Sequence, residues 1–172
     1  HRTGRSVIGR APDRTADHGR EAVYAAEEAA FGGTDADHVV ALPALQALAA
    51  SVVAGDWWGS CGGPSVEVVG ARADAASSSA RTARGPGVVV RLAPPQWTVA
   101  TVSHELAHAL AGVDHGHDER FRAAHVDVVA VLAGAEAAAV LGRSYGAHGV
   151  PPGHRSWPSP ERGRGDGFVI VP

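Results

Sequence analysis

The chain has 172 residues, of which 45% are hydrophobic and 19% are charged, a balance that excludes wholesale disorder and suits one domain with a hydrophobic core. Its 15 basic and 18 acidic residues give a net charge of -3, which argues against a dedicated nucleic-acid-binding protein. The single cysteine, Cys61, excludes an intrachain disulfide and a multi-cysteine zinc ribbon, so a metal site must use histidine and carboxylate ligands.

Charged residues recur from Arg2 to Glu28, and no apolar stretch typical of a signal peptide lies between them. We therefore expect cytoplasmic residence. The uncharged residues 39–55 include a proline and many alanines, so they predict a buried helix rather than a membrane span. The composition predicts no membrane partner and does not indicate an oligomeric state.

The first half of the chain predicts two helices followed by two strands. Residues 1–16 lack a hydrophobic period and predict a flexible lead-in to a single domain spanning residues 17–172. Residues 21–31 predict a helix that ends at a glycine pair, and a second helix, capped by Asp37, ends at Gly55. Strands are predicted at residues 65–71 and 87–92, with a loop at residues 56–64 and a polar connection at residues 73–86.

The second half predicts two more helices and a late strand. Residues 97–111 predict a helix directly after a proline pair, and residues 118–141 predict one long helix in which Gly134 is a weak point. Residues 167–172 predict a short terminal strand. This order indicates an α+β fold with a small mixed sheet. The strand at 88–92 could serve as an edge for an extended peptide, or equally as ordinary sheet structure.

The segment HELAH within the third predicted helix places two histidines four residues apart. Because each helical residue turns by roughly 100°, His104 and His108 lie about 40° apart on one face and can bind the same ion. Glu105 lies beside that face, where it can accept a proton from a water that zinc activates. We expect the opposite face to pack on the core through four apolar residues: Val99, Val102, Leu106 and Leu110.

A zinc hydrolase also needs a third protein ligand and one open position. The glycine-broken turn at residues 112–118 offers Asp114, His115 and His117. We favour His117, because it directly precedes the next helix, where Phe121 can pack into the core and hold it in place. His115 is the second choice and Asp114 the third.

This pattern, HELAH followed by a glycine-broken turn and a histidine with phenylalanine four positions on, resembles the SprT-like zincin metallopeptidases. From about residue 20 onward the chain also resembles a family of small bacterial metallohydrolases, through the segments REAVYAAE, VVVRLAPPQWT, HELAHALAG, GHDERFRAAHVDV and GDGFVIVP. The resemblance implies a zincin-like fold with an active-site helix. It also implies Zn²⁺ bound by His104, His108 and His117, with Glu105 as the general base.

The chain departs from the SprT-like pattern at several points. Asp118 stands where those proteins usually have glycine, and is better suited to cap a helix or to hydrogen-bond a ligand histidine. A single cysteine cannot build their zinc ribbon, so their DNA-linked role is not implied. Asp114 occupies the position of the third metzincin ligand, which excludes that longer motif.

We therefore predict a zinc-dependent hydrolase whose substrate is a peptide or protein, with the peptide bond itself inferred by analogy. One alternative is a non-catalytic binding or regulatory protein with a structural zinc site, although such a site has no need of Glu105 as a base. Another is a nucleic-acid-associated protease, which would need a basic face. Only a local cluster supports it: Arg155, Arg162 and Arg164.

Other residues have weaker claims to a functional role. His125 lies among apolar neighbours and predicts a buried, hydrogen-bonded histidine. Tyr145 or His148 could donate a hydrogen bond to a tetrahedral oxyanion, although packing or surface roles are favoured for both. The four tryptophans are expected to fill core and loop contacts: Trp57, Trp58, Trp97 and Trp157.

Overall fold

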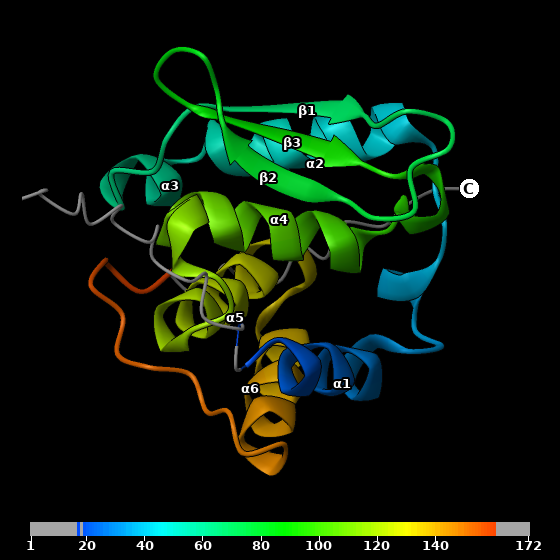
Figure 1. Ribbon diagram of the computed structural model, residues 1–172. Helices are drawn as coiled ribbons and strands as arrows, with labels where there is room; N and C mark the ends of the chain where they lie inside the picture. Colours follow the sequence, from blue (N-terminus) through cyan, green and yellow to red (C-terminus); the bar gives the residue numbers. More distant parts are fainter. Residues whose placement is uncertain (1–16, 18, 161–172) are drawn as a thin grey trace, which may run out of the picture.

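The computed structural model describes residue 17 and residues 19–160, which form six α-helices, three 3-10 turns and one three-stranded sheet (Figure 1). The fold is therefore α+β, as the sequence predicts. The predicted lead-in at residues 1–16 and the predicted strand at residues 167–172 lie outside the described residues.

The sheet consists of β1 (Val66–Gly70), β2 (Ser79–Thr82) and β3 (Val88–Leu92), in the order β1-β3-β2. The central strand, β3, runs parallel to β1 and antiparallel to β2. The two predicted strands are confirmed. Of the two alternatives for residues 88–92, ordinary sheet structure is confirmed and an edge is excluded, because β3 pairs with β1 on one side and with β2 on the other.

Strand β2 lies inside residues 73–86, which the sequence predicts to be only a polar connection. Its residues are half-buried or exposed, so the strand has no apolar face whose alternation could reveal it. Its backbone pairs with β3 in a register that aligns Ser79 with Arg91 and Thr82 with Val88. Pairing across the sheet, rather than local sequence preference, forms this strand.

The first three helices are α1 (Arg20–Phe31), α2 (Leu42–Val53) and α3 (Asp56–Ser60). Helices α1 and α2 are confirmed, but the predicted loop at residues 56–64 contains α3. Asp37 does not cap α2. It lies in a 3-10 turn, and α2 begins after Ala41 with a proline in its first turn, where proline's fixed φ suits a helix start.

In place of the predicted long helix at residues 118–141, the structure has α5 (Glu119–Ala133) and α6 (Ala135–Ala147). Gly134 separates them with φ +93° and ψ 167°, a backbone conformation that glycine adopts easily and other residues rarely do. Within the described residues, no helix has both the length and the apolar character needed to cross a bilayer.

Helix α4 (Val99–Ala111) lies at the centre of the molecule (Figure 1). It packs against β2 and β3, and it also contacts α2, which packs against β1. The two helices therefore cover one face of the sheet, the face on which β3 buries Val88, Val90 and Leu92. Helix α5 packs on α4, and α6 packs on both α5 and α1. A residue of α4 can thus contact elements from distant parts of the chain.

Candidate metal centre

Helix α4 begins two residues later than the helix predicted at residues 97–111 and ends at the same residue. Thr98 precedes it and its Oγ1 accepts a hydrogen bond from the Thr101 N–H at 3.1 Å, while Gly112, at φ +105°, ends it. The predicted apolar face is confirmed, because its four residues are at most 8% exposed: Val99, Val102, Leu106 and Leu110. His104 and Glu105 are also buried, at 5% and 6% exposed. His104 faces α1 and the approach to α5, where it contacts Glu27 and His117.

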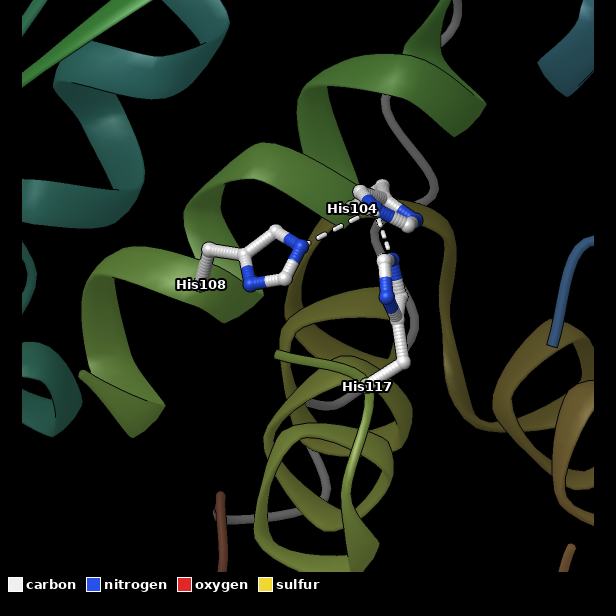
Figure 2. A group of neighbouring side chains, drawn as sticks. All are labelled: His104, His108 and His117. Atoms are coloured by element: carbon white, nitrogen blue, oxygen red, sulfur yellow. Dashed lines mark hydrogen bonds between the residues drawn. The ribbon is translucent and has the colours of Figure 1, made fainter. Parts of the chain in front are cut away.

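Three imidazole rings converge beside α4 (Figure 2). His104 and His108 come from α4, and His117 comes from the segment just before α5. The Nε2 atom of His104 lies 3.1 Å from Nε2 of His108 and 3.2 Å from Nε2 of His117. Nitrogen ligands of a tetrahedral zinc, at about 2.0–2.1 Å from the ion, are about 3.3 Å apart. The structure therefore brings the three predicted histidines to metal-binding distance of one another.

The turn before α5 directs His117 toward α4. Gly116 has φ +58° and ψ -139°, a conformation essentially restricted to glycine, which reverses the chain after the 3-10 turn. Asp118 then caps α5 by accepting the N–H of Phe121 at 2.9 Å, as predicted. His117 is thus held at the rigid start of a helix and is only 7% exposed.

The two alternative third ligands do not join this group. Asp114 and His115 lie in the 3-10 turn (Val113–His115). The Nδ1 atom of His115 lies 2.8 Å from a carboxylate oxygen of Asp118, and its side chain is 45% exposed. Neither belongs to the groups that could hold an ion among the described residues.

Two carboxylates contact the outer nitrogens of these rings, and sequence reasoning missed both. Oε1 of Glu27, on α1, lies 2.8 Å from Nδ1 of His104. Oδ2 of Asp17 is hydrogen-bonded to Nδ1 of His117, and Oδ1 of Asp17 accepts the His117 backbone N–H at 3.3 Å. Carboxylates so placed fix the tautomer and orientation of a ligand histidine and direct its Nε2 toward a metal.

The two carboxylate contacts bear on which ring nitrogens of the candidate ligands carry protons. When Nδ1 of His104 and of His117 each donates to a carboxylate, the Nε2 lone pairs of the two rings face each other at 3.2 Å. A proton on Nε2 of His104 can be donated to His108 or to His117, but not to both at once. A metal ion at the centre satisfies all three lone pairs at once.

The local charges act differently on the individual histidines. Burial lowers the pKa of His104, but the charge and hydrogen bond of Glu27 outweigh it and hold that pKa above its usual value. Burial, together with the charges of His104 and His117, lowers the pKa of His108 to about 2. His108 is therefore neutral at physiological pH, which is the form that binds a metal.

Phe121 forms the floor beneath the three rings. It is fully buried, and its ring centroid lies 4.9, 4.3 and 4.9 Å from the centroids of His104, His108 and His117. Its predicted burial is confirmed. This apolar floor limits water on one side of the histidines and restricts their rotation.

Glu105 lies at the wall of a cleft of about 420 Å³. The cleft runs between α1, the loop that leads into β2, and the first turn of α4, and His104 also lines it. Burial raises the pKa of Glu105, and Glu27 adds to this, while His104 and the Ala80 backbone lower it. A raised pKa makes this carboxylate a stronger base than an exposed glutamate.

A second buried network surrounds Glu27. His125 is fully buried, with Nε2 2.9 Å from Ser103 Oγ and Nδ1 2.7 Å from the Tyr145 hydroxyl, which confirms its predicted hydrogen-bonded burial. Oε1 of Glu27 lies 3.5 Å from Nδ1 of His125 and accepts a 3.4 Å hydrogen bond from Tyr145. With His104 and His125, Glu27 forms a second group within metal-binding distance.

The remaining candidates have structural contacts. Tyr145 is fully buried, whereas His148 is exposed and bonds through Nδ1 to the Ser144 carbonyl oxygen at 2.8 Å. The tryptophans fill core and loop contacts as predicted: Trp58 and Trp157 are buried, and Trp57 and Trp97 pack against the core.

Comparisons with family models, with curated proteins and with solved structures gave no match to this chain.

Proposed function

We propose that this protein is a zinc-dependent hydrolase with a zincin-like arrangement, in which His104, His108 and His117 bind the ion and Glu105 is the general base. The proposal is carried by the Nε2 atoms of His108 and His117, which lie 3.1 and 3.2 Å from Nε2 of His104. Carboxylates already orient two of these rings. The chemistry of the donors fits zinc, which commonly takes three histidines and leaves one position open.

When bound, zinc lowers the pKa of a water ligand from about 15.7 toward 7 and polarises a carbonyl group. Glu105 is adjacent in sequence to a ligand histidine and reaches the same cleft, so it can take a proton from the attacking water and return it to the leaving amine. The buried surroundings of Glu105 raise its pKa, which strengthens it as a base for the first of these steps.

A peptide or protein is the proposed substrate. The residues of the site require only a polarised carbonyl, so the choice of an amide rests on the resemblance to zincin peptidases. The cleft beside His104 and Glu105 is bordered on one side by Ser77 and Ser78, which lead into edge strand β2. An extended substrate in that cleft would bring a backbone carbonyl toward the site.

The alternative is a non-catalytic structural zinc site, here called a zinc clip. The burial of the histidines supports it. His104 and His117 are 5% and 7% exposed, and the ion would join α4 to the start of α5. Such a site would stabilise the fold without catalysing a reaction. The two functions make opposite predictions for Glu105, which a clip does not need.

The test is Glu105→Gln, compared with Glu28→Gln, which removes an exposed carboxylate from the same cleft. We expect zinc-replete wild type to cleave casein or a broad peptide library. Glu105→Gln should bind one zinc per chain and lose about 10²- to 10⁴-fold in turnover, the usual contribution of a general base. Glu28→Gln should retain activity. Metal content is measured by elemental analysis and turnover by mass spectrometry of the products.

Removal of a ligand gives the complementary result. His104→Ala leaves two histidines, so zinc and activity should be lost together. Stoichiometric zinc in this variant would contradict the ligand assignment. Zinc-bound wild type that cleaves none of these peptides would favour the clip.

A further inference from the structure

Hydrolysis of an amide needs a hydrogen-bond donor for the carbonyl oxygen, which becomes negatively charged as water adds to the carbon. The two donors suggested by the sequence are not placed for this role. Tyr145 is fully buried against His125, and the Nδ1 atom of His148 bonds to the Ser144 carbonyl oxygen. Neither lines the cleft that reaches Glu105.

A different phenol lies at the mouth of the site. Tyr24, on α1, lines the cleft together with His104 and Glu105. Its ring stacks on His104 with centroids 5.6 Å apart and planes inclined by 15°, and it meets the His117 ring edge-on at 5.3 Å. The residue is 43% exposed, so it separates the candidate ligands from solvent while remaining accessible to a substrate.

Helix geometry explains why Tyr24 lies there. Arg20, Tyr24 and Glu27 follow a spacing of i, i+4 and i+7, which places them on one face of α1. Glu27 contacts His104, so this face is turned toward the metal centre. The Arg20 guanidinium lies 5.4 Å from the centroid of the Tyr24 ring and also lines the cleft, where it adds positive charge beside the phenol.

We propose that Tyr24 is a catalytic residue of the hydrolase described above, on which this inference rests, and that its hydroxyl hydrogen-bonds the carbonyl oxygen of the scissile amide. In the addition step, a water oxygen forms a bond to the carbonyl carbon and the carbonyl π pair moves to the oxygen. The proton lost by water passes to Glu105. Tyr24 keeps its own proton, and its hydrogen bond strengthens as the oxygen becomes charged.

Two substitutions separate the hydroxyl from the ring. Tyr24→Phe keeps the stacking on His104 and removes only the donor, whereas Tyr24→Ala removes both. Cobalt-substituted protein is titrated with methylphosphonate, a tetrahedral oxyanion, and with imidazole, a neutral metal ligand with no oxygen to stabilise. Cobalt absorption reports both titrations, and thermal unfolding checks that each variant is folded.

We expect Tyr24→Phe to bind cobalt and imidazole like wild type and methylphosphonate roughly tenfold more weakly, the effect of one lost hydrogen bond to a charged group. On casein peptides its kcat should fall about 10²-fold with little change in KM, because the bond forms mainly in the transition state. Tyr24→Ala should also weaken cobalt binding. Arg20→Gln should weaken methylphosphonate binding, whereas Arg91→Gln, on the sheet surface, should not.

Unchanged methylphosphonate binding and kcat in Tyr24→Phe would overturn this inference while leaving the proposed function intact. Loss of cobalt from Tyr24→Phe would also overturn it, because the hydroxyl would then support the metal rather than the substrate. Wild type that takes up no metal would refute the proposed function as well, so the two failures are distinguishable.

Discussion

At the scale of single residues, Glu27 has contacts that its sequence position does not indicate. It lies in an alanine-rich helix beside a second glutamate, Glu28, yet only Glu27 contacts the buried rings. Burial raises the pKa of Glu27, but the charge and hydrogen bond of His104 and the charges of His125 and His117 outweigh it and lower that pKa. Glu27 is therefore an anionic acceptor that fixes the donor nitrogen of a candidate ligand.

Glu27→Gln should weaken zinc binding about 10- to 100-fold, the usual cost of losing the carboxylate partner of a ligand histidine. The side chain keeps its shape but loses the charge that holds the His104 tautomer. Competition with a chromophoric chelator measures the affinity. Glu28→Gln provides the matched control, because it removes the neighbouring carboxylate from the same helix. Equal affinities in the two variants would show that Glu27 does not support the site.

At the scale of elements, the sequence predicts the features that neighbouring residues determine. The HELAH helix follows from its periodicity and from the prolines and glycine that bound it, and His117 follows from its place before a capped helix. Glu27 pairs with His104 across 77 residues and Asp17 with His117 across 100, so no spacing rule indicates either contact. Strand β2 was missed for the same reason, because its pairing with β3 and not its sequence forms it.

Asp118 affects both the stability of α5 and the geometry of the candidate metal centre. Its carboxylate caps α5 through the Phe121 N–H, and the residue before it is His117. Asp118→Ala should lower the free energy of unfolding by about 1 kcal/mol, the usual cost of a lost N-cap, and should also weaken zinc binding. Urea unfolding of the metal-free protein measures the first effect and chelator competition the second.

Asp114→Ala is the control for Asp118→Ala, because Asp114 lies in the same connection and caps no α-helix. If Asp118→Ala has the same free energy of unfolding as wild type, the Asp118 cap contributes nothing to the stability of α5.

At the scale of the whole molecule, the candidate metal centre lies where distant segments meet. Helix α1 and Asp17 supply the carboxylates, α4 supplies two histidines, and the turn before α5 supplies the third. These contacts exist together only in the folded chain, so an ion that binds all three histidines binds the native state and not the unfolded one. Binding of such an ion would therefore be thermodynamically linked to folding.

Zinc should accordingly raise the stability of the wild-type protein, by about 2.7 kcal/mol at a free concentration 100 times Kd and about 4.1 kcal/mol at 1,000 times Kd. Thermal unfolding with buffered zinc measures the shift, and a chelator should reverse it. Glu105→Gln should show the full shift, because it keeps the three histidines, whereas His108→Ala should show little. A His108→Ala protein stabilised as much as wild type would place the ion elsewhere, and the Glu27, His104 and His125 group would then be the next site to examine.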